Sequence, residues 1–263
     1  MATLDDIYPR KLDLGRVAER TVWVLGRQPL MIFGLALLLY GVPAAGSMML
    51  ANRWLDIAEP FGVFHHPTFW GAGLVSLLIA AFLEVSLLAV TMGELGGRAA
   101  APGEVVLAGL KFMLPLFAVN LFYLLGVCVG LVLLVVPGIM LALAWCVAAP
   151  ALLVERSGIT EVFGRSADLT RDNRWRLLGL FLIAAVASSI IGGVGGGHAY
   201  GYHYRWSGFP FEEMILSPTR IVIAAVLKSL AHAVAVVALG VIYVELRSLK
   251  EGAAPADLGQ VFD

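Results

Sequence analysis

Residues 136–180 read VPGIMLALAWCVAAPALLVERSGITEVFGRSADLTRDNRWRLLGL, and this stretch decides the fold. A Pro-Gly pair between apolar runs is followed by a short apolar segment, an amphipathic charged segment and an Arg-Trp-Arg sequence that begins another apolar run. Arg, Lys and Trp gather where helices enter a membrane. The stretch therefore predicts helices that turn at a membrane surface and cross the membrane again.

The composition extends this prediction to the whole chain. Its 263 residues are 60% hydrophobic and 14% charged, with a mean hydropathy of +0.87, whereas about a quarter of the residues of a soluble domain are charged. A helix needs about 20 apolar residues to cross the roughly 30 Å hydrocarbon layer. We expect an all-α polytopic membrane bundle of six transmembrane helices with amphipathic interfacial helices. The expected spans are Leu30–Leu50, Thr68–Leu95, Phe112–Val136, Ile139–Val154, Leu177–Ile191 and Thr219–Leu246.

A single membrane domain is the simplest division of the chain. Residues 1–28 form an N-terminal segment, residues 29–250 form the six-span domain, and residues 251–263 form a polar tail. The N-terminal segment contains an amphipathic pattern over residues 14–27, with Asp13 placed to cap a helix. This helix either lies on the membrane or docks on the bundle as an ordinary helix.

The segments between the spans predict surface helices and turns. Residues 104–111 resemble a surface helix that leads into the third span, and Pro137–Gly138 predicts a turn between the third and fourth spans. Residues 158–172 carry apolar and charged residues on opposite faces, which indicates an interfacial elbow. Asp172 or Asn173 is placed to cap the helix that follows.

The distribution of Lys and Arg predicts the orientation in the membrane. With the N-terminus inside, fourteen of the 18 Lys and Arg residues fall on the cytoplasmic side, three fall outside, and Lys228 lies within a span. Cytoplasmic loops carry the excess of Lys and Arg, so we expect a multi-pass protein of the bacterial inner membrane with both termini in the cytoplasm. The Pro137–Gly138 turn then lies shallow on the outer side. The sequence contains no basic patch interleaved with aromatic residues, so we expect no nucleic-acid partner.

Polar groups within the spans are candidates for function, because they are costly in lipid. Glu84, Lys228 and His232 are ionisable, and Asn120 is an amide. We expect Glu84 to face the last helix and to pair with His232 or Lys228, which lie at similar depths. Either these groups are each satisfied separately or form only a structural pair, which together we favour, or they are part of an ion or proton pathway.

The elbow supplies candidates for binding lipid headgroups. Cations attract the anionic lipids of the cytoplasmic leaflet, and an indole ring sits at headgroup level. The candidates are Arg165, Arg171, Arg174, Trp175 and Arg176.

Metal binding and catalysis have little support in the sequence. Imidazoles suit zinc, copper or nickel, and four histidines fall on outer loops, but their spacing matches no known motif. They are His65, His66, His198 and His203.

Cys128 and Cys146 are read as small apolar fillers, each nine residues from Pro137 and hence at similar depth. We expect no cofactor, no resident metal and no enzymatic activity, since no catalytic triad can be placed.

Three groups of residues carry a resemblance to a known family. They are Val136-Pro137-Gly138-Ile139 with Trp145, Ala149-Pro150-Ala151 and Glu155; Arg165-Ser166 with Leu169-Thr170-Arg171-Asp172-Asn173-Arg174-Trp175-Arg176; and Tyr243-Val244-Glu245-Leu246-Arg247 with Lys250-Glu251-Gly252. Through them the chain resembles the six-helix bacterial membrane domain named for glycerophosphoryl diester phosphodiesterases. The catalytic barrel associated with some members would need roughly 250 further residues, so the resemblance implies the membrane domain alone.

These observations predict a non-catalytic membrane module that binds membrane lipid, or a membrane or cytoplasmic protein partner. The alternative is a transporter or channel for a small solute, ion or lipid. A transporter would be expected to show more buried charge, inverted repeats and helices broken near the middle of the membrane.

Overall fold

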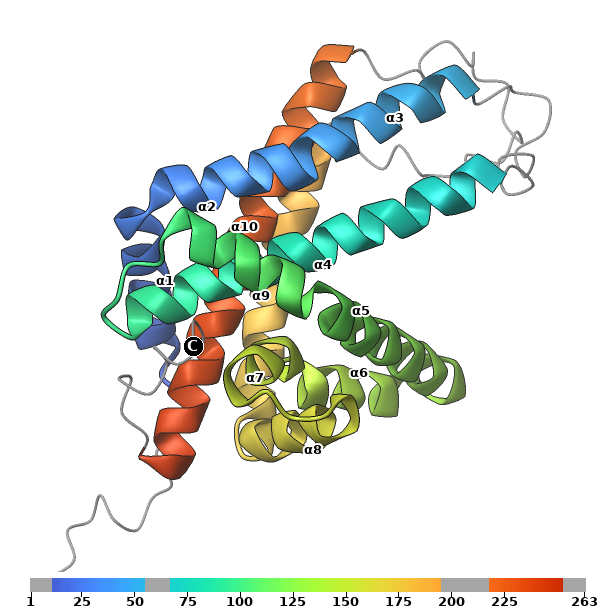
Figure 1. Ribbon diagram of the computed structural model, residues 1–263. Coiled ribbons are helices and arrows are strands. Elements are labelled where there is room, and N and C mark those ends of the chain that lie inside the picture. Colours follow the sequence, from blue (N-terminus) through green and yellow to red (C-terminus); the bar gives the residue numbers. More distant parts are fainter. Residues whose placement is uncertain (1–10, 55–66, 195–217, 253–263) are drawn as a thin grey trace, which may run out of the picture.

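Helices form almost all of the computed structural model, which describes residues 11–54, 67–194 and 218–252. No strand occurs in these residues, and the predicted all-α class is confirmed. The helices are α1 Leu14–Arg27, α2 Pro29–Ala36, the π-helical turn η2 Leu37–Gly41, α3 Val42–Trp54, α4 Pro67–Leu95, α5 Pro102–Leu133, α6 Val135–Trp145, α7 Ala148–Glu155, α8 Ile159–Thr170, α9 Arg174–Val194 and α10 Pro218–Glu251 (Figure 1).

Six helical segments of the described chain are long and apolar enough to cross a membrane. This confirms the predicted number of spans and indicates a multi-pass membrane protein. The segments are Pro29–Ser47, Gly73–Leu95, Pro102–Leu133, Val135–Glu155, Arg174–Ile191 and Pro218–Glu251.

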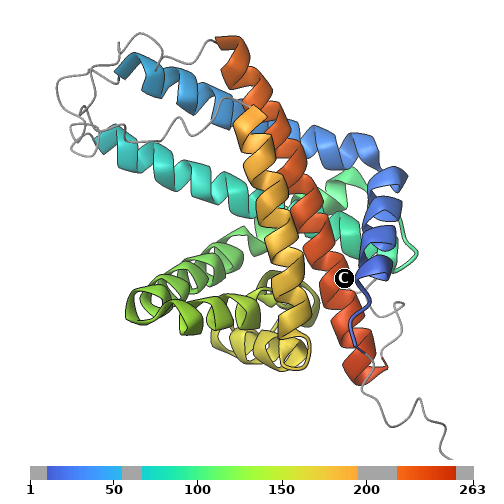
Figure 2. The same ribbon diagram turned by 180° about the vertical axis from the view of Figure 1, so that it is seen from behind.

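The helices pack tightly at one end of the molecule and diverge toward the other. We call the packed end, where α1 contacts the C-terminal ends of α4 and α10 and where α8 contacts α10, the charged end. Away from it, α3 and α4, the α5–α6 hairpin, and α9 with α10 point in different directions (Figures 1 and 2). All ten residues from 181 to 190 of α9 are exposed. A helix that is apolar all round is a membrane span, so lipid would cover these diverging halves.

The N-terminal amphipathic helix docks on the bundle. Asp13 caps α1 as predicted, because its Oδ1 accepts from the backbone N–H groups of Gly15 at 2.9 Å and Arg16 at 3.3 Å. The buried face of α1 consists of Val17, Thr21 and Val24, and it packs against α10 and α4. Helix α1 is therefore docked on the bundle, with Val22 and Trp23 exposed on its other side.

The predicted turn at Pro137–Gly138 is wrong by three residues. The predicted surface helix over residues 104–111 continues into the third span as one helix, α5, and the chain breaks at Leu134, whose φ of −159° and ψ of 136° are extended. Pro137 lies in the first turn of α6, where a missing N–H costs nothing. Gly138 serves close packing instead, since a Cβ on Gly130 would lie 2.9 Å from the Cα of Gly138.

The predicted fourth span is interrupted near the charged end. Helix α6 ends at Trp145 and α7 begins at Ala148. The Ser166 hydroxyl of α8 donates to the Ala144 carbonyl at 2.8 Å and accepts from the Val147 N–H at 3.2 Å. Non-helical backbone in a membrane protein needs such internal partners, and α8 supplies them.

The first span contains a distortion at the position where Gly41 and Pro43 lie. The π-helical turn η2 ends at Gly41, and Pro43 follows in the first turn of α3. Gly41 also faces α10, because a Cβ on it would lie 3.3 Å from the Ser229 hydroxyl. A larger residue at 41 would therefore crowd the contact between η2 and α10.

Candidate functional site

Buried carboxylates hold α1 at the charged end. Glu245 of α10 is only 2% exposed, and its Oε1 lies 2.5 Å from Nη1 of Arg20, with Arg16 at 3.8 Å from Oε2. Glu94 of α4 is 4% exposed and accepts from the Gln28 amide at 2.5 Å. A carboxylate this deeply buried needs a charged or hydrogen-bonding partner, so these contacts tie α1 to two other helices.

A third carboxylate, Glu155, joins α7, α8 and α10. Arg165 Nε donates to both Glu155 oxygens at 2.8 Å, and its Nη2 donates to Glu251. The Tyr243 hydroxyl also donates to Glu155, at 2.8 Å. Burial lowers the pKa of Arg165, but hydrogen bonds and charge from Glu155 and Glu251 raise the pKa by more, so the net shift is upward. The guanidinium is therefore a fixed internal cation.

The five predicted headgroup ligands divide into two groups. Arg165 is bound to Glu155 and Glu251, and Arg176 donates to the Leu12 carbonyl, so both serve internal contacts. Within the described part of the chain, Arg171 and Arg174 make no ion pair, and the Arg174 Nε has no hydrogen-bond partner. Trp175 is 74% exposed. Arg171 and Trp175 are thus exposed to an external ligand. Arg174 is half-buried with its Nε buried, and its charge is unpaired among the described residues.

The N-terminal segment contributes a further cation to this place. The Leu12 N–H donates to Asn173 Oδ1 at 2.8 Å, and the Leu12 carbonyl accepts from Arg176. These contacts put the neighbouring Lys11, which is exposed, next to the start of α9. We call the set of Lys11, Arg171, Arg174 and Trp175 the α8–α9 corner.

Of the two predicted cap residues, Asn173 is the one that directly precedes α9, but its side chain makes a different contact. Its backbone carbonyl accepts from the N–H groups of Arg176 and Leu177, both at 3.0 Å, as the residue before a helix does. Its side chain, 5% exposed as a residue, is turned toward Leu12 instead. The amide thus joins two distant parts of the chain.

The predicted pairing of Glu84 with His232 or Lys228 is also wrong. Glu84 Oε2 accepts from the Asn120 amide of α5 at 2.7 Å. His232 stacks on Tyr40 of η2, with ring centroids 4.9 Å apart, and Lys228 is half-buried.

Glu84 does not reach His232 or Lys228 because α4 and α10 cross at an angle. Helices α4 and α10 meet closely at Gly240, where a Cβ would lie 2.9 Å from Thr91 Cγ2 and 3.3 Å from Leu88 Cδ2. They diverge beyond this crossing (Figure 1). At the level of Glu84 the nearest amide is therefore on α5, and the contact with Asn120 joins α4 to α5.

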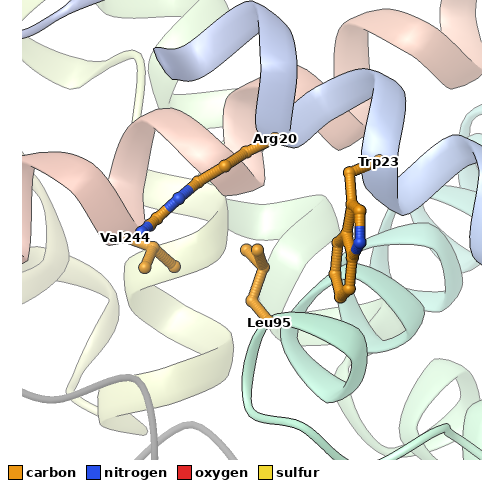
Figure 3. A pocket seen from close by; sticks show the side chains of 4 residues that line it. All are labelled: Arg20, Trp23, Leu95 and Val244. Atoms are coloured by element: carbon orange, nitrogen blue, oxygen red, sulfur yellow. The ribbon is translucent and has the colours of Figure 1, made fainter.

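A hollow of about 240 Å³ lies beside α1 at the charged end. Figure 3 shows its lining side chains, Arg20, Trp23, Leu95 and Val244, which come from α1, α4 and α10. The charge of Arg20 is already neutralised by Glu245. The hollow therefore offers an apolar surface without an unpaired charge.

The predicted histidine positions cannot be placed in a site. All four outer-loop histidines lie outside the described residues, namely His65, His66, His198 and His203. Among the described residues there is no group of three or more His, Cys, Asp or Glu side chains able to hold a metal ion. Cys128 is exposed and Cys146 is buried, and neither forms a disulfide. The break at Leu134 also puts the two cysteines at different distances from the turn.

Sequence reasoning missed the residues that organise the charged end. Glu94, Glu155 and Glu245 stood near the ends of apolar spans, and Arg16 and Arg20 stood four apart on the same helix. An acidic residue within the last turn of an apolar span, together with arginines on a separate amphipathic helix, was the available signal. Which arginine meets which carboxylate depends on packing between helices that are distant in the sequence.

Comparison of the chain with family models, curated proteins and solved structures found no match.

Proposed function

We propose that the protein is a non-catalytic membrane module that binds anionic lipids of the cytoplasmic leaflet through the α8–α9 corner. Its setting is the bacterial inner membrane, with both termini in the cytoplasm. The resemblance to the phosphodiesterase-associated membrane domain is consistent with such a module and belongs to the same proposal.

The observation that carries this proposal is that some cations at the charged end are paired with carboxylates while those of the α8–α9 corner are not. Arg16, Arg20 and Arg27 lie against the buried carboxylates of Glu245 and Glu94, and Arg165 lies against the half-buried Glu155 and the exposed Glu251. The cations of the α8–α9 corner have no such partner among the described residues, although they lie at the start of a membrane-crossing helix. Each Lys or Arg near an anionic surface contributes on the order of 1 kcal/mol to binding.

The exposed indole of Trp175 supports the same location. Trp is enriched at membrane interfaces, where its ring contacts the acyl region and its N–H reaches the headgroups. Trp175 stands between Arg174 and Arg176 in the first turn of α9. A lipid phosphate held by the arginines would thus lie beside a ring that contacts the same lipid.

The orientation in this proposal is supported by the bias of Lys and Arg. Most of these residues lie in segments that belong to the charged end, and the bias places that end in the cytoplasm. The α8–α9 corner would then face the cytoplasmic leaflet, where the anionic lipids are.

The transporter alternative has less support from the described polar groups. Glu84 is bonded to Asn120, and the interruption after Trp145 is closed by Ser166. Both features act as contacts between helices. A transport site would instead require polar groups that converge on a shared cavity.

The proposal is tested by measuring lipid retained by the protein in nanodiscs of phosphatidylcholine and phosphatidylglycerol. Native mass spectrometry after release from the disc counts the bound phosphatidylglycerol. Arg174→Ala should lower retention about fivefold, the change expected for one cation at a headgroup. Lys111→Ala is the matched control, because Lys111 is an exposed cation on α5, a helix that contributes no residue to the corner. Equal retention by both variants would contradict the proposal.

A further inference from the structure

The α8–α9 corner is built from two parts of the chain that are far apart in sequence. Arg171 and Arg174 come from the connection between α8 and α9 and from the first turn of α9. Lys11 comes from the N-terminal segment and is held there by the contacts of Leu12 with Asn173 and Arg176, across more than 160 residues. The corner is therefore a composite cationic surface whose charge depends on the docked N-terminal segment.

Among the described residues, the carboxylates of Asp13 and Asp172 near the corner leave most of this charge uncompensated. Asp172 is paired with Lys250, at 3.2 Å, and Asp13 is turned toward the N–H groups of α1. Arg176 donates to a neutral carbonyl, so its charge is also retained. Even without Arg176, the three cations Lys11, Arg171 and Arg174 thus provide more positive charge than one phosphodiester can neutralise.

A lipid that carries two phosphodiester groups matches this surface better than a lipid that carries one. One phosphate can be bound by Arg174 and Arg171 and the other by Lys11, with the indole of Trp175 against the acyl chains. We infer that the α8–α9 corner selects lipids with two phosphate groups. This inference rests on the proposed function, because it assumes that the corner binds anionic lipid.

The test compares diphosphatidylglycerol with phosphatidylglycerol in phosphatidylcholine nanodiscs of equal total negative charge. Native mass spectrometry reports how much of each lipid the full-length protein retains. The wild-type protein should retain diphosphatidylglycerol at least about fivefold more strongly. Lys11→Ala should lower retention of diphosphatidylglycerol about fivefold, the change for one cation, and should change retention of phosphatidylglycerol much less.

Two results distinguish failure of this inference from failure of the proposed function. Equal retention of the two lipids, or a Lys11→Ala variant that keeps the wild-type preference, would overturn the selection for two phosphates while phosphatidylglycerol binding still stands. If Arg174→Ala retains both lipids as strongly as the wild-type protein does, the α8–α9 corner is not the binding site and the proposed function fails as well. Lys111→Ala serves again as control and should behave as wild type for both lipids. Lys11 is exposed, so its substitution leaves the fold intact.

Discussion

Ser166 shows at the scale of one residue how a small polar side chain supports an interrupted helix. Its hydroxyl donates to the Ala144 carbonyl and accepts from the Val147 N–H, so it serves both sides of the break between α6 and α7. Thr170 adds a second hydrogen bond to the same carbonyl, at 3.3 Å. A buried backbone group without a partner costs about 1–3 kcal/mol.

Ser166→Ala should therefore lower the stability of the folded protein. The alanine fills nearly the same volume but leaves the Val147 N–H without its partner, so we expect a loss of about 1–3 kcal/mol. Thermal unfolding in detergent, followed by circular dichroism, measures the effect as a lower Tm. Ser248→Ala is the control, because Ser248 is half-buried at the end of α10 and bonds only within its own helix. An equal Tm for both variants would contradict the role assigned to Ser166.

At the scale of an element, α1 acts as a clamp on the charged end. Its arginines reach Glu245 of α10 and Glu94 of α4, while its buried face fills the space between these helices. Removing one partner of a buried ion pair is more harmful than replacing the pair by apolar groups, because it leaves an uncompensated charge. This asymmetry provides a test of the docking.

Arg20→Ala should loosen α1, because Glu245 loses its nearest cation and keeps only Arg16 at 3.8 Å. Amide hydrogen exchange of residues 14–27 should become faster. Adding Glu245→Leu to this variant should restore protection, since the buried charge is removed together with its need for a partner. Protection that is unchanged in Arg20→Ala, or lost further in the double variant, would argue against the clamp.

At the scale of the whole molecule, local patterns predicted the spans and the N-terminal amphipathic helix much better than the contacts between helices. The six spans follow from runs of apolar residues, and α1 with its Asp13 cap follows from spacing within fourteen residues. The interruption after Trp145 depends on Ser166, and the partner of Glu84 depends on where α4 crosses α10. Such features arise from the relative placement of helices, which a single sequence does not display.

The segments that carry the family resemblance also meet only in the folded molecule. Glu155 of α7 is hydrogen-bonded to Arg165 of α8 and Tyr243 of α10. The next residue after Arg165, Ser166, hydrogen-bonds to the backbone at the break after Trp145. These residues come from all three quoted groups. The resemblance itself stays a prediction, but one residue from each quoted group, Glu155, Arg165 and Tyr243, meets the others at the charged end.

The orientation of the whole molecule gives a prediction of its own. The charged end contains most of the Lys and Arg residues, so both it and the two termini should lie in the cytoplasm. Reporter fusions after Arg165 and at the C-terminus should both report the cytoplasmic side. Opposite sides for the two fusions would rule out the proposed topology.

The most direct test of the account compares two arginines that the sequence placed in one group and the structure separates. Arg174→Ala should lower phosphatidylglycerol retention about fivefold while leaving Tm unchanged, because Arg174 makes no ion pair and its Nε no hydrogen bond with the described residues. Arg165→Ala should lower Tm while leaving lipid retention unchanged, because Arg165 is bound to Glu155 and Glu251. Two results would contradict the account. One is a loss of lipid retention in Arg165→Ala without a change in Tm, and the other is a lower Tm in Arg174→Ala without a change in lipid retention.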